Sequence, residues 1–248
     1  MHRRIAVWWS AAALFGLPVA SAIAQTLDVK NLDITQGSLE IGLDNSIMSG
    51  PLPSQNRSAH DQSIDWGVRE WWRLSAVMKL ENPTVDNFRA SRVAVENIFV
   101  LRPLKQSNDI GLGLFAAVEA SINDATTNAF VFGPIVATKW DRLSFALNPF
   151  LEQTFGRNRE QGLHFTYGWQ AKYDIREGLA VGIEGYGHVG DMSNSPPLSD
   201  QEHRIGPVLF TEIALGDLKL TPDVGVLFGL TRATPDVTIK FNVGVALR

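Results

Sequence analysis

Apolar and polar residues alternate along most of this chain. The clearest example is segment 110–122, I-G-L-G-L-F-A-A-V-E-A-S-I, in which every second residue from Ile110 to Ile122 is apolar. Successive side chains of a strand point to opposite faces, so this segment predicts a strand with one wholly apolar face. It is longer than the usual strand of a soluble sheet and long enough to cross a bilayer at a tilt.

The same alternation predicts about twelve strands. They cover residues 38–47, 62–69, 73–81, 91–102, 110–122, 127–138, 142–154, 162–175, 179–189, 202–215, 218–230 and 237–248. Connections in odd order are long or polar (48–61, 82–90, 123–126, 156–161, 190–201 and 231–236), whereas those in even order are mostly short. Bacterial outer-membrane barrels show this asymmetry between external loops and periplasmic turns, together with an even strand number. Ten strands are the alternative count, because boundaries read from sequence shift by a few residues.

The predicted fold class is all-β: a transmembrane antiparallel up-and-down β-barrel over residues 37–248. Beyond the amino-terminal segment no run of 18 apolar residues remains, so helical spanning is excluded. A closed barrel is the other architecture that satisfies every backbone group in lipid.

Residues 1–24 have the features of a signal peptide: Arg3 and Arg4, an apolar stretch, and the small-x-small sequence Ala22-Ile23-Ala24. We therefore expect the protein to be exported through the periplasm to the outer membrane of a Gram-negative bacterium. The polar residues 25–36 are interpreted as a periplasmic lead-in to the barrel. Removing the signal peptide changes the net charge from −4 to −6. The negative net charge argues against a nucleic-acid partner. Outer-membrane lipid is the partner expected of the barrel's outer face.

If the apolar face meets lipid, almost every charge within a strand falls on the opposite, lumen-facing side. These residues are Glu40, Asp44, Lys79, Glu81, Arg92, Glu96, Arg102, Glu119, Glu152, Lys172, Glu184, Arg204, Glu212, Lys219, Asp223 and Lys240. The cost of a charge in lipid explains this segregation without any function. A lumen closed by ion pairs and a charged pore constriction are both open interpretations, and the mixed signs indicate no ion preference.

Aromatic residues near predicted strand ends indicate the girdles that mark membrane interfaces. They are Trp66, Trp71, Trp72, Trp140, Phe155, Tyr167, Trp169 and Tyr173.

Two segments carry a resemblance to known proteins. Residues 237–248, with alternating apolar residues from Val237 to Leu247, resemble the carboxy-terminal signal recognised by the barrel-insertion machinery, although they end in Leu247-Arg248 rather than an aromatic residue. Residues 64–72, I-D-W-G-V-R-E-W-W, are similar to a hairpin of uncharacterised proteobacterial outer-membrane barrels grouped with a phenol-degradation-pathway transporter family. The resemblance implies an outer-membrane barrel and leaves the substrate open.

Signs of catalysis or metal binding are weak. His188, Ser193 and Asn194 suggest an outer-membrane lipid hydrolase, but their spacing does not match that family, and a nucleophile needs a base within hydrogen-bond reach. His164 and His203 have no second ligand at metal-binding spacing, and the chain has no cysteine. No catalytic residue, metal or cofactor is expected.

The sequence therefore predicts, first, a passive channel or transporter for small solutes. The alternative is a non-conducting structural or surface-interaction barrel whose loops 48–61 and 190–201 meet external partners. A lipid-modifying hydrolase is third.

Overall fold

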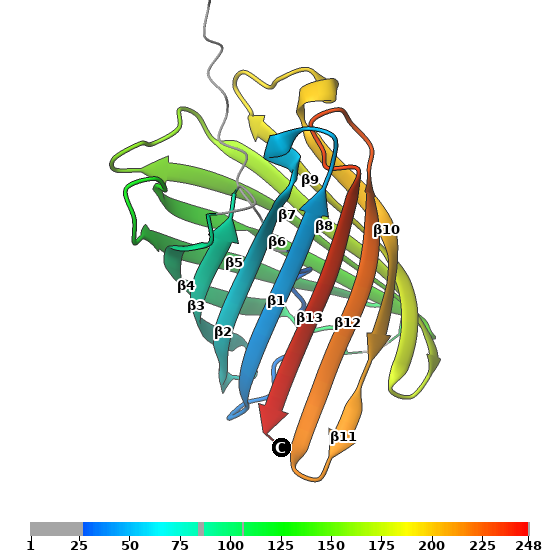
Figure 1. Ribbon diagram of the computed structural model, residues 1–248. Helices are drawn as coiled ribbons and strands as arrows, with labels where there is room; N and C mark the ends of the chain where they lie inside the picture. Colours follow the sequence, from blue (N-terminus) through cyan, green and yellow to red (C-terminus); the bar gives the residue numbers. More distant parts are fainter. Residues whose placement is uncertain (1–26, 84–86, 106, 248) are drawn as a thin grey trace, which may run out of the picture.

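The computed structural model of this chain describes residues 27–83, 87–105 and 107–247 (Figure 1). The proposed signal peptide, residues 1–24, lies outside the described residues. Within them, no helix is long and apolar enough to cross a membrane.

Antiparallel strands make up nearly all of the regular structure. They are β1 (Leu39–Ser49), β2 (Arg57–Arg69), β3 (Trp72–Asn82), β4 (Arg89–Arg102), β5 (Ile110–Ser121), β6 (Asn128–Trp140), β7 (Leu143–Phe155), β8 (His164–Arg176), β9 (Leu179–Asp191), β10 (Glu202–Thr211), β11 (Ile213–Leu215), β12 (Leu218–Gly229) and β13 (Val237–Leu247). Two short 3-10 helices, η1 (Pro53–Gln55) and η2 (Leu198–Asp200), lie in connections.

The strands close into a barrel. Each strand from β1 to β10 pairs with its neighbour in sequence, β1 pairs with β13, and β12 pairs with β13, β11 and β10. Glu212 separates β10 from the three-residue β11, and both pieces pair with β12, so the wall is a ring of twelve strands. The predicted fold class is confirmed.

The barrel has a turn end and a loop end. Short turns such as Gly216-Asp217 lie at the turn end with the start of β1 and the end of β13, and the longer connections lie at the loop end (Figure 1). In β2 the prediction is in error by five residues. That strand begins at Arg57, whereas residues 57–61 were predicted to be loop.

The two faces of the wall follow the predicted parity. In β5, Leu112, Leu114 and Val118 on the outer face are exposed, whereas Phe115 and Glu119 on the inner face are 4% and 5% exposed. In this strand the apolar side chains therefore face outward, and the charged Glu119 lies inside the barrel.

Residues 27–36, which we call the inner segment, lie inside the barrel. Leu27, Val29 and Leu32 are 1%, 7% and 8% exposed and belong to the two clusters of buried apolar residues in the lumen. The prediction of a periplasmic lead-in for this region is therefore corrected. Its apolar residues are buried by packing against the inner face of the wall.

Candidate functional site: the barrel lumen

The inner segment is held in the lumen by hydrogen bonds to the wall. The side chain of Asn148 on β7 accepts from the Lys30 backbone N–H at 2.6 Å and donates to the Lys30 carbonyl at 3.0 Å. Asn242 on β13 donates to the carbonyl of Leu27 at 3.0 Å. Buried side-chain amides thus satisfy backbone groups that would otherwise lose their hydrogen bonds to water.

The half of the lumen near the turn end is apolar on the side of β4, β5 and β6. Leu32 packs there in a cluster with Ile98, Val100, Phe115, Ala117, Ile135 and Ala137. Gly113 is required at this contact, because a Cβ atom added to it would lie 2.5 Å from Leu32 Cδ2. The inner segment therefore packs through Leu32 against the apolar inner face of β4 to β6.

The half of the lumen near the loop end contains a cavity of about 680 Å³, which we call the vestibule. Asp28 and Lys30 of the inner segment line it, together with residues of β2 to β10 and of connections at the loop end, among them 125–127, Asn158 and Glu160. Eight lining residues are carboxylic acids and four are lysine or arginine. The described wall of the vestibule therefore carries an excess of negative charge.

A chain of ion pairs crosses the vestibule wall from β2 to β7. Lys79 Nζ lies 3.5 Å from Asp61 and 2.9 Å from Glu119, and Arg92 Nη1 lies 2.8 Å from Glu119 and 3.7 Å from Glu152. A further pair joins Lys30 Nζ to Glu96 at 3.0 Å. Charge-assisted bonds of this kind offset the desolvation of the buried groups.

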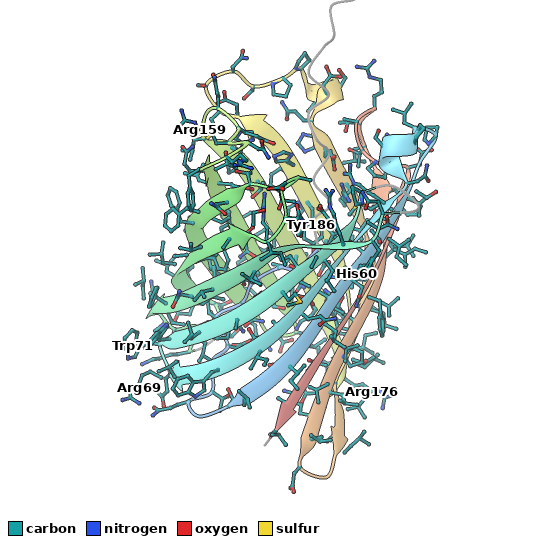
Figure 2. All side chains as sticks on the ribbon, turned by 60° about the vertical axis from the view of Figure 1, so that its left-hand side comes forward. His60, Arg69, Trp71, Arg159, Arg176 and Tyr186 are labelled. Carbon is teal, nitrogen blue, oxygen red and sulfur yellow. The ribbon has the colours of Figure 1, made fainter. Side chains whose placement is uncertain are left out.

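A second ion cluster lies deeper in the wall. Lys240 Nζ, on a side chain 1% exposed, lies 2.6 Å from Glu184 and 3.1 Å from Asp223. Glu184 also accepts hydrogen bonds from Tyr186 and Gln170. This network joins β8, β9, β12 and β13 across the lumen, and Figure 2 labels Tyr186 within it.

A third cluster and a set of loop contacts brace the loop end. Arg57 donates two hydrogen bonds to Glu202, which also pairs with Arg204. The buried Gln55 side chain donates to the carbonyls of Arg232 and Thr234. These contacts join the connection between β1 and β2 to the connection between β12 and β13, and the start of β2 to the start of β10.

One exposed ion pair adds to this brace. Arg232 donates to the Asp200 carboxylate, and this hydrogen bond lowers the pKa of Asp200 below its ordinary value. The Asp200 side chain is 42% exposed and lies in the connection between β9 and β10, so the contact orders the loops rather than the wall.

Several residues predicted to face the lumen belong to the ion clusters above. Beyond the clusters above, Glu81 pairs with Arg89, Lys172 lies over the Phe210 ring, and Lys219 pairs with Glu212 near the turn end. Asp44 lies opposite Asn242 in the β1–β13 register, and Glu40 lies against Gly244.

Arg102 was predicted to face the lumen, and the structure places it elsewhere. The register shifts between Val100 and Arg102, so that Arg102 pairs with Leu112 of the outer parity. Its side chain is 58% exposed and bonds to Asp109 at the turn end. A bulge reverses the parity on which the prediction depended.

Seven charged residues that line the vestibule or belong to these clusters were not among the predicted set: Asp28, Lys30, Arg57, Asp61, Arg89, Glu160 and Glu202. Asp61 and Arg57 share the parity of Asp65 in β2, so an earlier start for that strand would have identified them. Asp28 and Lys30 have no such signal in the sequence, because the inner segment has no strand periodicity.

The proposed girdle aromatics lie on the outside. Trp66, Trp71, Trp140, Phe155 and Tyr173 are 43–53% exposed, and Trp71, Trp72 and Phe99 stack at the turn end. Trp169 differs, because it lies near the middle of β8, over Gly185. Their position at a membrane interface stays a prediction.

The residues considered for chemistry are not arranged as a hydrolase triad. Ser193 Oγ donates to Asp191 at 2.8 Å rather than to His188, and His188 stacks on His164 with ring centroids 6.0 Å apart. His203 bonds to Tyr167 and Gln201. Among the described residues, no group of three or more His, Asp or Glu side chains is placed to hold a metal ion.

Comparison with known proteins identifies the fold. No protein-family model matches the chain, and no curated protein matches it. Among solved structures, an outer membrane channel from Pseudomonas putida F1 has a TM-score of 0.59 at 10% identity, covering 89% of this chain and 99% of that one. The NanC porin gives 0.56 at 12% identity, over 84% and 99% of the two chains.

The KdgM porin, solved in complex with disordered oligogalacturonate, gives a TM-score of 0.52 at 14% identity, covering 84% of this chain and 98% of that one. At these identities the likeness shows the fold alone. The chain has the closed barrel fold found in outer-membrane porins and channels.

Proposed function

We propose that this protein is a passive channel for small hydrophilic solutes in the outer membrane of a Gram-negative bacterium. The observation that carries the proposal is the vestibule, a charged cavity of about 680 Å³ inside a closed barrel with an apolar outer face. The loop end is then external and the turn end periplasmic, as expected for long and short connections. The fold shared with porins supports the same proposal.

The vestibule favours cations and neutral solutes. Its described lining has eight acids against four lysines and arginines, and a wall of one net sign attracts the opposite charge. A polyanion such as the oligogalacturonate named for the KdgM porin would be repelled by it. We therefore do not carry that ligand over to this chain.

The inner segment limits conduction. It lines the vestibule through Asp28 and Lys30 and continues into the half of the lumen beyond it, where Leu32 is packed among apolar residues of β4 to β6. Solutes that enter the vestibule must pass this segment or displace it. Removing residues 27–36 leaves every strand pair of the wall in place, so the barrel is expected to fold without them.

Conductance in planar bilayers tests this function. Refolded mature protein should give discrete steps, and the reversal potential in a potassium chloride gradient should have the sign of cation selectivity. Deletion of residues 27–36 should raise the step size severalfold. Circular dichroism of both proteins controls for the loss of β structure.

The second candidate is a non-conducting barrel that meets partners through its external loops. The filled half of the lumen and the braced loops around Gln55 favour it. If neither the full protein nor the deletion variant gives steps, the channel proposal fails and this second candidate is preferred.

We also propose that the outer face contacts outer-membrane lipid and that β13 is recognised by the barrel-insertion machinery. The alternating apolar residues of β13 support this, as does its position between β1 and β12. Kinship with barrels of the phenol-degradation-pathway type remains a proposal, based on residues 64–72.

A further inference from the structure

The lipid-facing side of β1 and β2 carries a polar strip. On β1 and β2 the outward positions near the loop end are Asn45, Ser58, His60 and Gln62. The register places Asn45 opposite His60, with Leu43 and Ile47 on either side of Asn45. Leu43 and Ile47 are 41% and 56% exposed, so the strip lies within the apolar belt and not beyond it.

Most of the strip is satisfied by internal hydrogen bonds. Asn45 Oδ1 lies 2.8 Å from His60 Nδ1, and Ser58 Oγ lies 3.0 Å from His60 Nε2. Asn45 Nδ2 donates to the carbonyl of Phe241 at 2.9 Å. Phe88 packs edge-on against the His60 ring, with centroids 5.7 Å apart.

Gln62 is the exception. Its side chain is exposed on the outer face between Leu43 and Met78, themselves 41% and 43% exposed. Within the described chain its carboxamide has no hydrogen bond to another residue. Hydrocarbon offers no partner for such a group, and leaving it unpaired there is costly.

We propose that the outer face of β1 and β2 binds a second copy of this chain in the plane of the membrane, through the strip Asn45, Ser58, His60 and Gln62. A two-fold axis brings the same patch of each copy together. A carboxamide both donates and accepts, so Gln62 of one copy is complementary to Gln62 of the other. The flanking leucine, isoleucine and methionine side chains pack around the polar contact.

The depth of Gln62 favours a second copy over a lipid headgroup as its partner. Gln62 is the sixth of the 13 residues of β2, near the middle of the strand. Figure 2 shows His60 partway up the wall, well above Arg69 and Trp71 at the turn end. A headgroup lies at the membrane surface, whereas a second copy presents polar groups at the same depth.

Single-cysteine crosslinking tests the proposal directly, because the chain contains no cysteine of its own. Leu43→Cys, on the outer face opposite Gln62, keeps the Gln62 carboxamide and should form a covalent dimer with a short bismaleimide in membranes. Ile183→Cys on β9, another lipid-facing position at 49% exposure, is the matched control and should give only the background of random collisions. Light scattering of the wild type in mild detergent should give twice the protein mass, and Gln62→Leu should reduce that dimer fraction.

Three results would overturn the proposal. The first is a Leu43→Cys crosslink no stronger than that of Ile183→Cys. The second is a wild type that is monomeric by light scattering and in lipid nanodiscs. The third is crosslinking of Leu43→Cys to a cysteine of a different protein in place of a second copy.

Discussion

The two halves of the lumen are built from the same alternating strands but differ in what fills them. Near the loop end the inner face carries paired charges around a cavity, as between Lys79 and Glu119. Near the turn end the inner face of β4 to β6 is small and apolar, and the inner segment packs there through Leu32. Strand periodicity therefore determines which residues face inward, whereas the chemistry of those residues determines whether the space holds solvent or chain.

The largest effect is expected where the ion pairs are most deeply buried. Lys240→Met would leave Glu184 and Asp223 without their shared cation, and removing one partner of a buried pair costs about 3–5 kcal/mol. We expect the free energy of unfolding in guanidinium, measured in micelles, to fall by that amount. Arg102→Met, at an exposed pair of the turn end, should cost at most about 1 kcal/mol. Equal losses for the two variants would contradict the account.

Leu32→Ala tests the apolar half. The side chain is 8% exposed, and truncating a buried leucine costs about 2–5 kcal/mol. The loss should weaken docking of the inner segment, so proteolysis within residues 27–36 should become faster and the conductance larger. Ile122→Ala, at an exposed position, serves as the control and should change neither. Unchanged proteolysis in Leu32→Ala would show that this packing does not hold the segment.

Asn148→Ala tests how far hydrogen bonds, as opposed to apolar packing, hold the inner segment. The substitution removes hydrogen bonds to the segment but little of its apolar contact area. Both bonds to the Lys30 backbone are lost, leaving polar groups unpaired at a cost of about 1–3 kcal/mol. Proteolysis of the inner segment should accelerate less than in Leu32→Ala. Asn97→Ala, which removes the bond from Trp72 Nε1 instead, should leave that rate at the wild-type value.

The smallest effect is expected at the exposed pair of Asp200 and Arg232. Because the bond lowers the pKa of Asp200, the contact is fully present above the ordinary pKa of the carboxyl and is lost as the pH falls through its lowered value. Asp200→Asn at neutral pH should speed hydrogen exchange at the Ala233 amide, which donates to the Ser199 carbonyl, without changing barrel unfolding. A shift of the global unfolding transition would show that the loops support the wall.

Much of the wall could be predicted from sequence, because an apolar outer face and a polar inner face leave a period of two. The prediction fails where that contrast disappears. Residues 57–61 of β2 have polar side chains such as Ser58 and His60 on the outer face, so they resemble a loop. At Arg102 a bulge changes the parity, and a bulge leaves no mark in the hydrophobic pattern.

The inner segment could not be predicted from periodicity. Leu27 and Val29 belong to one buried cluster and Leu32 and Ile34 to the other, and the three-residue step between the two pairs breaks a single strand or helix period. Their apolar character in an otherwise polar stretch was the available sign. The vestibule likewise depends on which charges pair across strands, which only the register of the closed barrel reveals.

Alkylation of single cysteines by a charged maleimide tests the contrast between the two halves most directly. Thr166 lines the vestibule, and Ala137 lies in the apolar cluster that contains Leu32, so the two variants are Thr166→Cys and Ala137→Cys. We predict rapid labelling of Thr166→Cys and slow labelling of Ala137→Cys in the full protein, with both labelled rapidly once residues 27–36 are deleted. Equal labelling of the two positions in the full protein would contradict the account.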